Sequence, residues 1–289
     1  MHRTSKISIN DRRKIRWISW LLIFLFICCL FFAAISTDIK TVCYTVRSEK
    51  IKSPVKICVV SDLHSCIHGD NQIKLIEAIR SGNPDLIAFT GDICDDHVPN
   101  IGTELLLDAI ASDYPCYYVS GNHEFWTGNM EGLREMFRSY GVTILRGDCG
   151  TIEIKGNNIN ICGIDDPDCY YYEPNGIPYK KQMSMLENAA DNGYFTIFLA
   201  HRPERIKQYL DFPFDLILSG HAHGGQWRIP GLVNGVFAPN QGAFPKYAGG
   251  QYSFGDTEFI VSRGLSLKNI RKLPRIFNPP ELVFITLER

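Results

Sequence analysis

Three short apolar segments each run directly into a cluster of metal-binding residue types, at intervals of about 30 residues. The segments are residues 55–60, 85–90 and 116–120, and the clusters begin at positions 62, 92 and 122. Apolar residues recur with helical spacing between them, which predicts helices near 71–80, 104–111 and 130–140. Strands and helices that alternate at this spacing are typical of βαβ units, so we expect an α/β fold with a largely parallel sheet.

The second half of the chain continues this pattern. A hairpin is predicted over 151–161 around Gly156-Asn157-Asn158. The other expected elements are a helix at 180–190, a strand at 194–200, a short helix after Pro203, and strands at 215–219, 257–262 and 281–287. Residues 224–255, rich in glycine and aromatic residues, are predicted to be a long loop, and loops of that length are usually functional.

The clusters together supply seven side chains that can ligate metal. In open α/β sheets, ligands bind beyond the carboxyl ends of the strands, so we expect these residues to meet at one edge. A single catalytic zinc needs three protein ligands, whereas a shared carboxylate holds two ions about 3.5–4 Å apart. The mixture of nitrogen and oxygen ligands favours Mn, Fe or Zn over Mg. The sequence therefore predicts two divalent metal ions, held by Asp62, His64, Asp92, Asn122, His201, His221 and His223.

Each cluster alone has an ordinary structural explanation. A Gly-Asp pair at a strand end often forms a turn, and a lone histidine such as His201 often belongs to a polar network. However, five of the eight histidines fall in these clusters, and every cluster follows a strand, which favours a common site. His68 and His97 lack such a placement, and we expect both at the surface.

The series of motifs resembles the calcineurin-like metallophosphoesterase superfamily. It reads Asp62-x-His64, Gly91-Asp92-x-x-Asp95, Gly121-Asn122-His123-Glu124, His201 and Gly220-His221-x-His223, within residues 55–289. The segments 200–204, 221–226, 262–265 and 275–281 are similar to a bacterial branch of membrane-associated phosphodiesterases. The resemblance implies a four-layer α/β/β/α sandwich.

The resemblance also implies a role for each site residue. Asp62, His64 and His223 would hold the first metal, Asn122, His201 and His221 the second, and Asp92 would bridge the two. His123 would lie beside the phosphate as a general acid or charge stabiliser, while Asp95 and Glu124 would orient ligands. Water that bridges two divalent ions loses its proton near neutral pH and supplies a hydroxide nucleophile.

The amino terminus is predicted to anchor the chain in a membrane. Residues 17–35 contain no charged side chain, and at about 1.5 Å per residue they are long enough to cross a bilayer. Residues 1–16 hold six Lys or Arg and one Asp, which favours a cytoplasmic tail and an extracytoplasmic catalytic domain. We expect a tail at 1–16, an anchor at 17–35, a juxtamembrane linker at 36–53 and a catalytic domain at 54–289. The alternatives are a signal peptide cleaved near Ala34-Ile35-Ser36 and a twin-arginine signal at Arg12-Arg13.

Charge and cysteine content limit the functions further. Residues 17–289 hold 24 basic and 30 acidic residues, which argues against a general nucleic-acid partner. None of the ten cysteines forms a CxxC pair, and the apolar surroundings of Cys58, Cys116 and Cys162 predict buried free thiols. Disulfide pairing and oligomeric state stay open at this point.

Several basic residues have two explanations each. Arg202 and Arg263 are predicted either to bind substrate phosphate or to form surface ion pairs. A basic patch of Lys268, Arg271, Lys272 and Arg275 would face either lipid headgroups or solvent.

The predicted function is that of a membrane-anchored phosphoesterase with two metals. It would hydrolyse phosphoester or pyrophosphate bonds, with a lipid-linked envelope precursor or a glycan precursor as the expected substrate. The alternatives are a phosphodiesterase acting on soluble nucleotides and a non-catalytic binding module built on the same fold.

Overall fold

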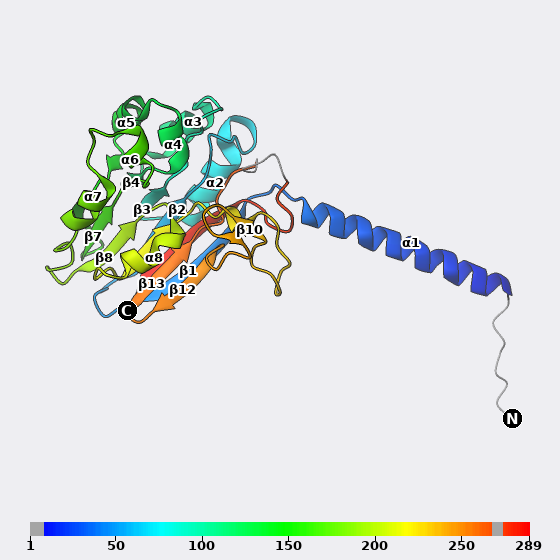
Figure 1. Cartoon of the computed structure of the whole chain (residues 1–289). Coiled ribbons are helices and arrows are strands. Elements are labelled where there is room, and N and C mark those ends of the chain that lie inside the picture. The colour runs from blue at the N-terminus through cyan, green and yellow to red at the C-terminus, as the bar shows by residue number, and fades with distance from the viewer. Residues whose placement is uncertain (1–8, 268–273) are drawn as a thin grey trace.

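Two six-stranded sheets form the body of the molecule (Figure 1). The computed structural model describes residues 9–267 and 274–289. The first sheet has the order β1 (Lys40–Arg47), β14 (Glu281–Glu288), β2 (Val55–Val60), β3 (Leu86–Thr90), β4 (Cys116–Val119) and β5 (Thr143–Ile144). The second has the order β12 (Gly250–Phe254), β13 (Thr257–Val261), β9 (Leu216–Ser219), β8 (Phe195–Leu199), β7 (Asn157–Gly163) and β6 (Asp148–Ile154).

Parallel pairing brings the carboxyl ends of the central strands together. In the first sheet Val60 lies opposite Phe89, and Thr90 lies opposite Val119. In the second sheet Leu199 lies opposite Leu218. The segments that follow β2, β3, β4, β8 and β9 therefore begin at one end of the body, which is where the predicted ligand clusters lie.

Apolar side chains fill three layers of core. One core lies between the two sheets and includes Val59, Ile197 and Ile285. A second packs the first sheet against α2 (Ile73–Gly82), α3 (Ile101–Ile110) and α5 (Met130–Ser139). A third packs the second sheet against α7 (Tyr179–Met185) and α8 (Ile206–Tyr209). The expected four-layer α/β/β/α architecture is thereby confirmed.

The remaining elements are short, except for the first helix. They are α4 (Asn122–Trp126), α6 (Cys169–Tyr172), β10 (Phe237–Ala238), β11 (Gly242–Ala243) and 3-10 turns at Asp70–Gln72, Pro203–Arg205 and His223–Gly225. Helix α1 (Ile9–Ala34) projects away from the body (Figure 1). The most apolar part of the segment Arg13–Ala34 has a mean hydropathy of 2.5, and none of its residues is buried against the body. The helix is thus long and apolar enough to cross a membrane.

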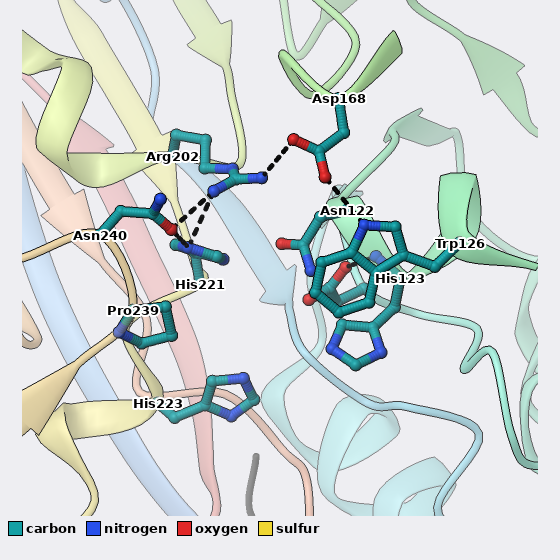
Figure 2. A pocket seen from close by; sticks show the side chains of 10 residues that line it. Asn122, His123, Trp126, Asp168, Arg202, His221, His223, Pro239 and Asn240 are labelled. Carbon is teal, nitrogen blue, oxygen red and sulfur yellow. Dashed lines mark hydrogen bonds and ion pairs between the residues drawn. The ribbon is translucent and has the colours of Figure 1, made fainter. Parts of the chain in front are cut away.

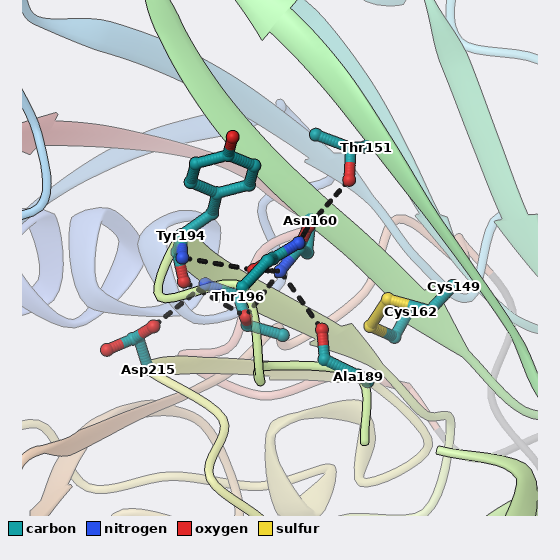
Figure 3. Close-up of a disulfide and its surroundings, with 9 residues drawn as sticks. Cys149, Thr151, Asn160, Cys162, Ala189, Tyr194, Thr196 and Asp215 are labelled. Atoms are coloured by element: carbon teal, nitrogen blue, oxygen red, sulfur yellow. Dashed lines mark hydrogen bonds between the residues drawn. A yellow bond between two sulfur atoms is a disulfide. The ribbon is translucent and has the colours of Figure 1, made fainter. Parts of the chain in front are cut away.

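Three local expectations were wrong. Residues 36–53 are not simply a linker, because they contain β1, which pairs in parallel with β14 along its whole length. The long loop at 224–255 contains β10, β11 and β12. Cys162 is not a free thiol, since it forms a disulfide with Cys149 across β6 and β7 (Figure 3). Cys58 and Cys116 are buried and free, as predicted.

Candidate metal centre

The structure brings the seven predicted ligands together at the carboxyl ends of the strands. Asp62 and His64 follow β2, Asp92 follows β3, Asn122 begins α4, His201 follows β8, and His221 and His223 follow β9. All seven residues are buried, with at most 6% of their surface exposed. Six of them form two groups of ligand atoms, one from Asp62, His64, Asp92 and His223 and one from Asp92, His201 and His221, and a third group joins His64 to Asp95 and His123.

Asp92 belongs to both groups. Its Oδ2 atom lies 3.1 Å from His201 Nε2 and 3.7 Å from His64 Nε2. Its Oδ1 atom accepts a hydrogen bond from the backbone N–H of His123 at 2.9 Å. The carboxylate is therefore held through one oxygen while the other points between the two groups.

Several buried polar atoms of the ligand residues have no hydrogen-bonding partner. Among the described residues, His64 Nε2, Asp92 Oδ2, Asn122 Oδ1 and His223 Nδ1 have no hydrogen-bonding partner. Leaving such an atom unpaired in the interior costs roughly 1–3 kcal/mol. Four such atoms in one place are accounted for if cations bind there, so the donor set fits metal ions.

Hydrogen bonds on the far side of three imidazoles set their orientation. His64 Nδ1 lies 3.0 Å from Asp95, and His201 Nδ1 lies 2.8 Å from the Thr90 carbonyl oxygen. His221 contacts Asn240 Oδ1 through Nε2 at 2.8 Å. A proton placed on each of these nitrogens leaves the other ring nitrogen as a lone-pair donor toward the centre, as metal-ligating histidines require.

The backbone of five of these residues is left-handed. Asp62, His64, Asp92, His221 and His223 have φ values of 48°, 49°, 53°, 66° and 47°. Such conformations cost non-glycine residues about 1–3 kcal/mol each and concentrate at functional sites. Glycines stand where the chain passes closest to the ligands: a Cβ atom on Gly121 or Gly220 would collide with the carboxylate of Asp92 or Asp62.

Glu124 holds the turn after β3 in place. Its two carboxylate oxygens accept hydrogen bonds from the N–H groups of Asp92, Ile93, Cys94 and Gly121, at 2.6–3.0 Å. Burial and the neighbouring Asp92 raise the pKa of Glu124 to about 7, although the N–H donors favour the ionised form. Glu124 thus connects the ligand cluster at Asp92 to the ligand cluster at Asn122 through backbone hydrogen bonds.

The charges of the centre are strongly interdependent. Burial opposes ionisation of both His201 and Asp92, but their mutual attraction outweighs it. The pKa of His201 is raised to about 10, and the pKa of Asp92 is held well below its usual value. Burial, with the nearby Arg202 and His201, lowers the pKa of His221, and burial with His64 lowers that of His223. The carboxylates favour positive charge here, which is what a metal ion supplies.

His123 lies at the open side of the centre. Its Nδ1 atom is 2.6 Å from Asp96 Oδ1, and its ring packs against His64 and Trp126. With the Nδ1 proton bonded to Asp96, Nε2 is the nitrogen left to exchange protons with a bound molecule. His123 lines a pocket of about 190 Å³ together with Trp126, Asp168, Pro239 and Asn240 (Figure 2).

Arg202 lines the same pocket but is not a surface residue. Its guanidinium is buried and pairs with both carboxylate oxygens of Asp166, with Asp168 at 3.1 Å and with Asn240 at 2.7 Å. Arg263 is also buried, where it bonds to Asn234 and faces Glu281. The expectation of surface ion pairs was wrong for both, because each arginine has acidic or amide partners inside the fold.

Two further expectations concern exposure. His68 is buried rather than exposed, since it contacts the Leu265 carbonyl oxygen at 2.8 Å, whereas the His97 side chain is 87% exposed. Of the predicted basic patch, Arg275 is buried. The other three residues, Lys268, Arg271 and Lys272, lie outside the described residues.

The sequence reasoning missed Asp96, Asp166, Asp168 and Asn240. Asp96 directly follows Asp95, so its position beside a ligand cluster was a signal that it too could reach the site. Asn240 comes from the segment expected to be a functional loop. The two residues Asp166 and Asp168 follow β7, at the same sheet edge as the ligand clusters.

The chain is similar to a known protein family and to several of its members. The family model described as calcineurin-like phosphoesterase matches residues 55–225. A protein of Aquifex aeolicus described as an uncharacterized metallophosphoesterase is 29% identical over 257 residues, which cover 85% of this chain and 90% of that protein. A transmembrane protein with metallophosphoesterase domain from Bos taurus is 28% identical over 233 residues, covering 75% of this chain and 49% of that protein.

Solved structures share the fold at low sequence identity. The NAD nucleotidase NadN of Haemophilus influenzae superimposes with a TM-score of 0.51 and is 15% identical. The match covers 74% of this chain and 46% of that one. At this identity the similarity concerns the architecture alone.

Proposed function

The chain belongs to the calcineurin-like phosphoesterase family, a family of metal-dependent hydrolases, and we propose that it is a membrane-anchored phosphoesterase that acts on an envelope precursor. The observation that carries the proposal is the position of Asp92 Oδ2, a buried atom without a hydrogen-bonding partner that belongs to both groups of candidate ligand atoms. A carboxylate in that position is suited to bridge two ions.

The donor set determines how the ions would be held. Asp62, His64 and His223 are assigned to one ion, Asn122, His201 and His221 to the other, and Asp92 to both. The mixture of imidazole, carboxylate and amide donors favours Mn, Fe or Zn. When bound, two such ions supply an activated water and neutralise charge on the phosphoryl oxygens.

His123 is assigned as the proton donor to the leaving group. Its contact with Asp96 through Nδ1 fixes the ring, and its Nε2 atom is free to reach a molecule in the pocket. General acid catalysis of this kind contributes roughly 10²–10⁴-fold to the rate. Replacing His123 by Ala should therefore lower turnover by that order without removing a metal ligand.

A second pocket next to the metal centre supports a substrate larger than a simple phosphate. It has a volume of about 550 Å³, shares Asp168, Arg202 and Asn240 with the first pocket, and is lined by Tyr170, Tyr171, Tyr179, Lys180 and Arg205. Aromatic faces and cationic side chains suit sugar rings and additional phosphate groups. We assign the leaving group of a glycan or lipid-linked precursor to this pocket.

Two features support a membrane location with the body outside the cytoplasm. The basic residues of the amino-terminal region all lie within residues 1–16, before the apolar part of α1, which favours a cytoplasmic amino terminus. The disulfide between Cys149 and Cys162 is of a kind that persists in oxidising compartments and is rare in the cytosol.

Hydrolysis by the full chain tests this function. The protein is purified in detergent without chelator and assayed with Mn²⁺ on bis-p-nitrophenyl phosphate and p-nitrophenyl phosphate, alongside His123→Ala. We expect Mn²⁺-dependent turnover that falls at least about 100-fold in the variant. The ratio of the two rates identifies the substrate as a diester or a monoester. Wild-type turnover in His123→Ala would remove His123 from the chemistry, and turnover confined to soluble nucleotides would contradict the envelope substrate.

A further inference from the structure

An ordered segment beside α1 carries large apolar side chains on the surface of the body. We call residues 226–246 the apolar loop. Its exposed apolar side chains are Trp227 at 40%, Ile229 at 51%, Leu232 at 84%, Phe237 at 43% and Phe244 at 71%. Five large apolar side chains exposed within one short segment are more than the scattered apolar residues of an ordinary surface, and such a concentration usually marks an interaction site.

Backbone hydrogen bonds hold the apolar loop in a defined shape. Ile229 and Val233 bond to each other in both directions, at 3.0 and 2.8 Å. Val236 bonds to the Trp227 carbonyl, and Phe244 bonds to the Val236 carbonyl. The apolar side chains are thus presented outward by fixed backbone, which distinguishes the loop from a segment that exposes them transiently.

Hydrogen bonds also connect the apolar loop to the end of α1. The Phe277 N–H donates to the carbonyl oxygen of Ala34, the last residue of α1, at 2.7 Å. The adjacent Ile276 exchanges hydrogen bonds with Gln226 and Arg228 at the start of the loop. Figure 1 accordingly shows the segment around β10 beside the point where α1 leaves the body. If α1 crosses the bilayer, this face of the body lies at the bilayer surface.

The charge of the apolar loop also fits a lipid surface. Residues 226–246 contain Arg228 and Lys246 but no Asp or Glu, whereas the chain after residue 16 has an excess of acidic residues. Aromatic side chains are enriched at membrane interfaces, and basic residues near the surface are attracted to anionic headgroups. Both properties are those of a segment that rests in the headgroup region.

We propose that the apolar loop docks into the outer region of the same bilayer that holds α1. The inference rests on the membrane anchor proposed above. Docking of the loop gives the metal centre a fixed position relative to the bilayer. Pro239 and Asn240, which line the pocket beside His123, belong to this loop. Docking therefore places the mouth of the pocket next to the lipid, where a lipid-linked substrate is presented.

Fluorescence quenching by brominated lipids tests the proposal in the full chain. The four tryptophans are replaced by phenylalanine, and Leu232→Trp or Phe244→Trp is added to that background. The proteins are placed in nanodiscs of equimolar phosphatidylcholine and phosphatidylglycerol, with or without bromine on the acyl chains. The matched control is Tyr194→Trp, because Tyr194 is 38% exposed and directly precedes β8, at the opposite end of that strand from His201.

We expect bromine to quench the reporters at 232 and 244 several-fold more than the reporter at 194. Equal quenching at all three positions would overturn the proposal. A chain that keeps Trp20 as its single tryptophan reports on α1 separately. Quenching of Trp20 without quenching at 232 or 244 would leave the anchor standing and reject loop docking. No quenching of Trp20 would reject both.

Discussion

Two adjacent aspartates each orient a different histidine of the site. Asp95 lies 3.0 Å from Nδ1 of His64, which is assigned to a metal, and farther, at 3.7 Å, from Nδ1 of His123. Asp96 lies 2.6 Å from Nδ1 of His123, which is assigned to proton transfer. The two side chains are similarly buried, at 15% and 12% exposed. Replacing Asp95 and Asp96 one at a time therefore distinguishes an effect on metal binding from an effect on proton transfer.

We expect Asp95→Asn to weaken metal affinity and Asp96→Asn to lower kcat while metal content is retained, by about 10- to 100-fold in each case. Titration with Mn²⁺ under assay conditions measures the first effect, and turnover at saturating Mn²⁺ measures the second. Identical behaviour of the two variants would contradict the separate roles of the aspartates.

The ligand residues were predictable, but their supporting contacts were not. Asp62, Asp92 and His201 each follow a strand in the sequence, and parallel strands necessarily align their carboxyl ends. Asn240 belongs to a segment without regular periodicity, so its contact with His221 depends on how the loop folds over the site. The partners of Arg202 are likewise set by tertiary packing.

At the scale of elements, the hairpin of β6 and β7 closes one edge of the second sheet. The disulfide links the opposed residues Cys149 and Cys162, which are 13 positions apart. A cross-link over a loop of this length stabilises a protein by about 2–4 kcal/mol, chiefly by restricting the unfolded chain. Neither cysteine lines the pockets beside the metal centre.

We therefore expect Cys149→Ser to lower Tm and to leave Mn²⁺-dependent turnover within a factor of two or so of wild type, as expected for a contact remote from the chemistry. Thermal unfolding without reductant measures the change. Cys43→Ser, which removes an exposed free thiol, serves as the control. An unchanged Tm would mean that the hairpin is not stabilised by the cross-link.

Sequence periodicity identified the central strands but not the edge strand β1. Strands such as Leu86–Thr90 are buried throughout, so their apolar runs are unambiguous. In β1 only Val46 is fully buried, and the strand pairs with β14, more than 200 residues away in the chain. The local sequence therefore carries little sign of a pairing that depends on the opposite end of the chain.

At the scale of the whole molecule, the proposed anchor α1 would divide the chain between two compartments. In the proposed topology, with the basic tail in the cytoplasm, the exposed Cys43 of β1 would lie outside the cell membrane. In a Cys66→Ser background, a membrane-impermeant maleimide added to intact cells should label Cys43. A Ser5→Cys reporter in a Cys43→Ser chain should be labelled only after permeabilisation. The reverse pattern would place the metal centre in the cytoplasm.

The central claim is that Asp92 is shared by two metal ions. The most direct test is the metal content of the purified full chain and of Asp92→Asn after equilibration with Mn²⁺, with the exposed Asp108→Asn as a control. We expect about two ions per chain in the wild type and the control, as in other two-metal sites. Asp92→Asn should hold at most one and should lose turnover. Two ions and full turnover in Asp92→Asn, or a single ion in the wild type, would contradict the shared carboxylate.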